Sequence, residues 1–234
     1  MVSRLSKQQT CNARIFNIQI SNIMKKSIFI FYLMLLASSA NTQNQIDAFI
    51  KEAQGYIAQK NYKQAQMSLQ DAISEINNIF AKQLVESLPA EVNGLKADDS
   101  EVNVNTAAMG VMGGGIQITK TYRHPTKKEN EVELDMLTNS PMLNAMNMFL
   151  TNPGMLGQGQ KSIRVGTRRA IIKSEQEDYT DDKGTTKPIQ VSEIQIPLSQ
   201  TLVTFKTRGF ATEQDAISFA AKFDLDKIKT LLGE

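Results

Sequence analysis

Apolar residues recur at intervals of three and four between residues 44 and 88, the spacing of one face of an α-helix. Two such runs occur, with a break at Lys60 and Asn61 and an end at Pro89. The first run contains Ile46, Phe49, Ile50, Ala53, Tyr56 and Ile57, and the second contains Ala65, Leu69, Ala72, Ile73, Ile76, Phe80 and Leu84. We therefore predict an antiparallel helical hairpin over residues 41–88, with each run on one apolar face.

After Pro89 the period changes to two, which is typical of strands with one buried face. In residues 115–124, Ile116, Ile118 and Tyr122 alternate with polar residues, and residues 130–137 alternate in the same way. Residues 91–95 form a short lead strand in this interpretation. Further strands are expected over residues 161–175, interrupted by a turn or bulge at Gly166, and over residues 189–196 and 201–209.

Helix signals alternate with these strands. Ser140 and Pro141 are typical of the N-cap and the first position of a helix, which should continue to Asn152. This segment has so few polar residues that most of the helix should be buried. Thr212 should cap a helix over 213–223, and a last helix closes the chain. The predicted fold class is α+β: an N-terminal antiparallel helical hairpin followed by a mainly antiparallel sheet covered by helices, the second part spanning residues 89–234.

The start of the chain has a different pattern. Lys25 and Lys26 precede an uninterrupted apolar run from Ile28 to Ala37, and small residues follow up to Ala40. This is the layout of a secretory signal peptide over residues 24–40, cleaved between Ala40 and Asn41. A membrane span needs about 20 apolar residues, so no stable anchor is expected after cleavage. An uncleaved signal anchor and a buried core helix are the alternatives.

Residues 1–23 have no clear periodicity, and we interpret them as a disordered upstream extension. Whether the initiator is Met1 or Met24 stays open. Loss of residues 1–40 removes five of the 26 basic residues and none of the 24 acidic ones, which leaves a net charge of −3. A mildly acidic body without a basic patch argues against nucleic acid as a partner. The only cysteine, Cys11, is removed too, which excludes disulfides, thiolate metal sites and a cysteine nucleophile from the mature chain.

Three resemblances add expectations. The helical hairpin is similar to a single tetratricopeptide-type unit, on Phe49, Ala53, Tyr56, Tyr62, Ala65, Leu69 and Ala72. Segments 88–98, 109–123, 138–154 and 163–171 and the closing helix resemble a family of exported bacterial proteins to which no activity is assigned. That resemblance implies a helical hairpin with a small α+β domain and no catalytic residue. The order of the later elements is also similar to the Mog1/PsbP-like fold.

Candidate catalytic residues are few. His124 is the only histidine, no nucleophile elbow accompanies it, and it lies at a predicted loop, so we expect an exposed loop residue, with a proton switch as an alternative. Asp178, Asp181 and Asp182 do not have EF-hand spacing, so we expect a solvated turn there. A hydrolase would need an acidic residue together with Arg168 or Arg169. The chain is therefore predicted not to be an enzyme and to need no cofactor.

Methionines and glycines give the best candidate site. Seven methionines fall between Met109 and Met155, which indicates core packing, an adaptable contact surface or a soft-metal site. The predicted ligand or partner site comprises Met109, Met112, Gly113, Gly114, Gly115, Tyr122 and Arg123. The alternative metal site, for Cu(I), comprises Met109, Met112 and His124.

The resulting functional hypothesis is a non-enzymatic module, exported to the periplasm or beyond the cell, that binds a protein or a small ligand. A lone helical hairpin must bury its apolar faces on its own domain, on a partner or on a second subunit, so a homodimer through the hairpin is one alternative. A Cu(I)-type carrier is the second hypothesis and a hydrolase without a recognisable motif is the third.

Overall fold

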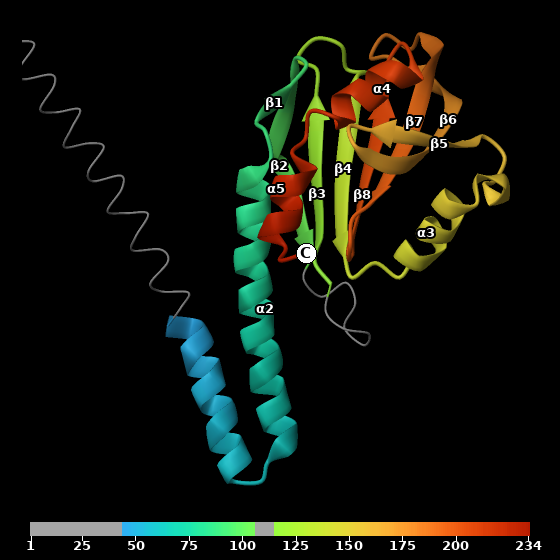
Figure 1. Cartoon of the computed structure of the whole chain (residues 1–234). Coiled ribbons are helices and arrows are strands. Elements are labelled where there is room, and N and C mark those ends of the chain that lie inside the picture. The colour runs from blue at the N-terminus through green and yellow to red at the C-terminus, as the bar shows by residue number, and fades with distance from the viewer. Residues whose placement is uncertain (1–43, 106–114) are drawn as a thin grey trace, which may run out of the picture. The chain divides into compact units, whose positions relative to one another are not determined.

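Figure 1 shows a computed structural model of the chain, which describes residues 44–105 and 115–234. The chain divides into two compact units, Met1–Glu75 and Ile76–Glu234. The expected signal peptide, its cleavage site and the upstream extension lie outside the described residues. The predicted fold class is confirmed: two helices precede an antiparallel sheet that carries further helices.

The two N-terminal helices cover residues 44–58 and, as α2, Tyr62–Ser87. They are joined where the sequence predicted a corner. Lys60 has a φ of 60°, and the backbone N–H of Asn61 donates to the carbonyl oxygen of Tyr56 at 2.9 Å. Helices commonly end with a residue of positive φ, followed by a backbone N–H that bonds back to a carbonyl oxygen of the last helical turn.

Small side chains line the contact between these two helices. Ala53 of the first helix and Ala65 and Ala72 of α2 are 1%, 3% and 3% exposed. Between them, the hydroxyl of Ser68 donates to Glu52 Oε2 at 3.1 Å. Because these side chains are short, two helix backbones can approach each other closely along this line.

The second unit contains an eight-stranded sheet in the order β1-β2-β3-β4-β8-β7-β6-β5, in which all neighbours are antiparallel. The strands are β1 (Glu91–Val92), β2 (Leu95–Asn105), β3 (Gln117–Arg123), β4 (Glu131–Thr138), β5 (Gln160–Val165), β6 (Arg168–Thr180), β7 (Thr186–Pro197) and β8 (Thr201–Arg208). The other elements are α3 (Leu143–Thr151), the 3-10 turn η1 (Pro153–Met155), α4 (Glu213–Ala220) and α5 (Leu225–Leu231).

One face of the sheet carries the main core. The alternation predicted for β4 is confirmed, because Val132, Leu134 and Met136 are at most 1% exposed. Residues of α4, of α5 and of the C-terminal half of α2 pack on the same face. Phe219 of α4 meets the rings of Tyr122 and Phe223 within 6.0 Å, so aromatic contacts join the helical layer to the strands.

The opposite face carries α3, and here two expectations are corrected. The helix begins at Leu143, after a turn at Pro141 and Met142, and not at Ser140. It is also not mostly buried, since only Leu143, Met146 and Leu150 are buried. These residues pack against Ile171 of β6 and Leu202 of β8, which point away from the main core. A helix that covers a sheet from outside buries one stripe only.

The N-terminal edge of the sheet also differs from the expectation. The short lead strand predicted over residues 91–95 is a β-hairpin, in which β1 and β2 meet at Asn93 and Gly94. Both turn residues have positive φ, 52° and 82°, as the tightest hairpin turns require. The following strand, β2, was not predicted. Its pairing with β3 is irregular between Asp98 and Asn103.

Candidate interaction surface

Several large apolar side chains of the helical hairpin are exposed, and five of them share one side of the helix pair. These five are Ile50, Ile57, Tyr62, Leu69 and Ile73, with exposed fractions of 39%, 49%, 67%, 43% and 45%. All five belong to the first compact unit. We call this set the hairpin patch.

Helix geometry puts the hairpin patch on one side of the helix pair. Ile50 and Ile57 are seven residues apart, and Tyr62 and Leu69 are likewise seven apart, so each pair shares one helix face. On the first helix Ile50 and Ile57 are rotated by about 60° and about 40° from Ala53. On α2 Tyr62 and Leu69 are rotated by about 60° and about 40° from Ala65, in the same direction. In an antiparallel pair, equivalent flanking positions of the two helices lie on the same side. Ile73 extends this side along α2.

The sequence pattern did not reveal this division. It assigned all apolar residues of each run to a single face. The structure buries Ala65 and Ala72 between the helices and leaves Leu69 and Ile73 exposed. The available signal for this division was the width of the apolar arc on each helix. The arc is wider than the stripe that a contact between small side chains can cover.

The predicted binding residues do not form one site in the described structure. Met109, Met112, Gly113 and Gly114 lie outside the described residues, and Gly115 is buried. Tyr122 is 0% exposed, and its hydroxyl donates to the carbonyl oxygen of Pro89 at 3.0 Å. Its ring therefore lies in the core, on the opposite face of β3 from Arg123.

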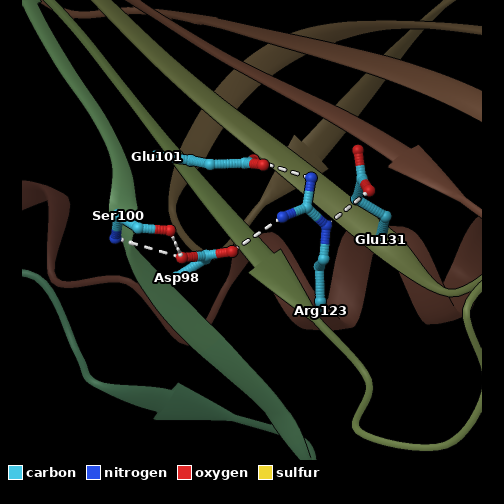
Figure 2. A network of polar contacts seen from close by, with 5 residues as sticks. All are labelled: Asp98, Ser100, Glu101, Arg123 and Glu131. Carbon is cyan, nitrogen blue, oxygen red and sulfur yellow. Dashed lines mark hydrogen bonds and ion pairs between the residues drawn. The ribbon is translucent and has the colours of Figure 1, made fainter.

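Arg123 lies in a network of carboxylates contributed by β2 and β4 (Figure 2). Its Nη1 contacts Asp98 Oδ2 at 2.7 Å, its Nη2 contacts Glu101 Oε2 at 2.6 Å, and its Nε donates to Glu131 Oε2 at 3.0 Å. Asp98 also accepts hydrogen bonds from the backbone N–H and the hydroxyl of Ser100. Each nitrogen of the guanidinium thus already has a carboxylate partner, so the network joins three strands and does not present a free anion-binding group.

The pKa shifts of Asp98 and Arg123 are consistent with this structural role of the network. Hydrogen bonds from Ser100, together with the charge of Arg123, lower the pKa of the Asp98 carboxyl below its usual value. Hydrogen bonds to Glu101 and Glu131 raise the pKa of Arg123 further. The network fixes the irregular stretch of β2 against β3.

His124 belongs to the loop that follows β3. Its Nδ1 accepts hydrogen bonds from the backbone N–H groups of Thr126 and Lys127, at 3.2 and 3.1 Å. The side chain is half-buried and shapes the turn. The other two members of the alternative Cu(I) site, Met109 and Met112, lie outside the described residues, so that site stays a prediction.

The described methionines have two different environments. Met136 and Met146 are buried, at 1% and 2%, as gap-filling core residues should be. Met142, Met148 and Met155, by contrast, are 51%, 45% and 54% exposed around α3 and η1. Core packing therefore accounts for only part of the methionine-rich segment.

The aspartates of the β6–β7 tip form a structured turn. Asp181 Oδ1 accepts from the backbone N–H groups of Lys183 and Thr185, at 2.9 and 2.8 Å, and Asp182 pairs with Lys128. Within residues 44–105 and 115–234, no cluster of three or more His, Cys, Asp or Glu residues is arranged to hold a metal ion.

The arginines considered for a hydrolase have structural partners. Arg168 pairs with Asp226 of α5, and Arg169 Nη1 donates to the carbonyl oxygen of Leu150 at 2.9 Å. Both side chains thus attach helices to β6.

A hollow of about 140 Å³ lies at the end of β4 in the second unit. Its lining combines the side-chain amides Asn77 and Gln200 with apolar residues such as Phe80. Glu234, also in the lining, accepts hydrogen bonds on both carboxylate oxygens, from Gln200 N at 2.9 Å and from the Thr201 hydroxyl. This carboxylate is occupied in holding the C-terminal residue against the start of β8.

No protein-family model, curated protein or solved structure matches this chain. The resemblances to an exported bacterial family, to a tetratricopeptide-type unit and to the Mog1/PsbP-like fold therefore stay predictions.

Proposed function

We propose that the protein is an exported, non-enzymatic interaction module that holds a protein partner on the hairpin patch. The observation that carries this proposal is the exposure of five large apolar side chains along one side of the helical hairpin. Contiguous apolar surface of this kind is typical of protein–protein contact sites.

The energetic argument is simple. Full burial of a large aliphatic or aromatic side chain contributes roughly 1.5–3 kcal/mol, so covering a half-exposed one contributes about 1 kcal/mol. Five such side chains therefore supply about 5 kcal/mol before the cost of association is subtracted. In the unpartnered chain this surface stays in water, and a partner that covers it recovers that free energy.

Export is supported by the leader pattern and by cysteine usage. The basic and apolar run before Ala40 has the layout of a cleaved signal, and the sequence has no cysteine after Cys11. Among the described helices, none combines the length and apolar content required to cross a bilayer.

Lysine cross-linking in intact cells tests the proposal. Lys51 and Lys63 directly follow Ile50 and Tyr62 in the sequence and are exposed, so both lysines lie within cross-linker reach of a partner on the hairpin patch. The variant Leu69→Lys/Ile73→Lys should lose cross-links formed by Lys51 and Lys63. Met67→Lys is the matched control, because Met67 is 54% exposed but lies about 160° around α2 from Leu69.

The outcomes separate clearly. Cross-links that disappear in the double variant and persist in the control support the proposal. An identical set of cross-links in all three proteins, or none in the unmodified chain, contradicts it. Cell fractionation with N-terminal sequencing of the same preparation tests export, since the proposal requires a mature chain that begins near Asn41 and lies outside the cytoplasm.

A further inference from the structure

We infer that the partner on the hairpin patch is a second copy of the same hairpin, so that two chains together form a four-helix bundle. This inference rests on the proposed function and names the partner for the same surface. It follows from the charge of the hairpin, the polar residues around the patch and the packing requirement of a helix pair.

The charge of the hairpin permits contact between identical copies. Residues 44–75 contain three lysines, Lys51, Lys60 and Lys63, and four acidic residues, Asp47, Glu52, Asp71 and Glu75, which gives a net charge of −1. A nearly neutral surface does not repel its own copy over long range. A partner chosen by opposite charge would instead require a patch dominated by one sign.

Three side-chain amides lie at the rim of the hairpin patch, together with charged residues such as Asp47 and Lys51. Gln54, Gln66 and Gln70 are exposed and neighbour the patch along the two helices. In a two-fold interface, a residue near the axis meets its own copy. An amide carries both a donor and an acceptor and can therefore pair with another amide, whereas a carboxylate or an ammonium group would meet its own charge.

A helical hairpin on its own has a single helix–helix contact. Apart from Ile46, the buried apolar side chains of residues 44–75 are Ala53, Ala65 and Ala72, which add little apolar area. In a four-helix bundle, each helix also buries a second apolar side against the other helix pair. Ile50 and Ile57 on the first helix, with Tyr62, Leu69 and Ile73 on α2, supply that second side. Two copies facing each other would enclose ten large side chains.

The mass of the protein in solution tests this inference. The protein recovered from cells expressing the full sequence should elute as a dimer in size-exclusion chromatography with light scattering, across a concentration series. Leu69→Lys/Ile73→Lys should raise the dimer dissociation constant at least about tenfold, because each substitution acts on both copies. Met67→Lys should leave the constant unchanged, and circular dichroism should show equal helix content in all three proteins.

A cysteine pair gives an independent readout if the double variant does not fold. In a Cys11→Ser background, Gln66→Cys should form a covalent dimer under mild oxidation, and Gln64→Cys, on the opposite side of α2, should not. A monomer at all concentrations, with no selective covalent dimer, overturns the inference. If patch-dependent cross-links to a different chain persist in cells in that case, the proposed function stands and only the second copy is excluded. If these cross-links are absent too, both fail.

Discussion

The buried hydroxyl of Tyr122 donates a hydrogen bond to the carbonyl oxygen of Pro89, at 3.0 Å. Pro89 follows α2, and Tyr122 lies in β3 with an exposed fraction of 0%. This bond therefore attaches the chain after α2 to a central part of the sheet. It satisfies a polar atom that would otherwise be costly to bury.

Tyr122→Phe should destabilise the second unit by about 1 kcal/mol at neutral pH, because the carbonyl of Pro89 loses its partner. Burial also raises the pKa of Tyr122, and the nearby charge of Asp99 adds to the effect. A raised folded-state pKa contributes stability that is complete below the unfolded value, about 10, and is lost as the pH rises above it.

The difference between the two proteins should consequently shrink in alkali. Urea unfolding from about pH 8 to about pH 11 measures it, because only the unmodified protein has a tyrosine at position 122 that ionises on unfolding. A gap that stays constant over this range would show that Tyr122 ionises equally in both states.

Arg123→Met should lower the melting temperature by several degrees at neutral pH, because Asp98, Glu101 and Glu131 would then face one another without a cation. The lowered pKa of Asp98 means that its contribution is present above the unfolded value, about 3.9, and is lost as the pH falls through the folded value. The deficit of the variant should therefore persist down to about pH 4 and diminish below it.

Arg208→Met is the matched control for this network. Arg208 has one carboxylate partner, Glu177, at 3.2 Å, whereas Arg123 has three. Differential scanning calorimetry should give the smaller loss for Arg208→Met. Equal losses would mean that the three carboxylates around Arg123 add no more stability than the single carboxylate beside Arg208.

Gly209→Ala should cost more stability than Gly184→Ala. Both glycines have positive φ, 73° and 79°. A Cβ at Gly184 would meet open space, whereas one at Gly209 would lie 2.5 Å from the carbonyl oxygen of Glu129. Gly184→Ala should therefore cost about 1–2 kcal/mol of left-handed strain, and Gly209→Ala should add a backbone clash. Chemical denaturation of the two variants makes the comparison, and equal costs would contradict it.

The sequence pattern was informative wherever one face of an element is buried in the main core. The alternation in β3 and β4 and the capping role of Thr212, whose hydroxyl accepts from Asp215 N, are confirmed. The strand β2 was missed, because it lies near the edge of the sheet with polar residues on most positions. Asn93 and Gly94 were the available signal, since this pair favours a tight β-hairpin.

The candidate surfaces were harder to predict for a related reason. The partners of Arg123 include Asp98 and Glu101 of β2, so a network that depends on the missed strand could not be found. The hairpin patch was missed for a different reason. Periodicity shows that Leu69 is on the apolar side of α2, but it does not show whether another helix covers that side.

The accessibility of a thiol in the hairpin patch tests the central claim most directly. In a Cys11→Ser background, Ile73→Cys and Met67→Cys introduce similar thiols on different sides of α2, at positions whose native side chains are 45% and 54% exposed. The account predicts that in intact cells the thiol of Ile73→Cys is alkylated much more slowly than that of Met67→Cys, and that the difference vanishes in denaturant. Equal alkylation rates in the cell would contradict the claim that another protein chain covers the hairpin patch.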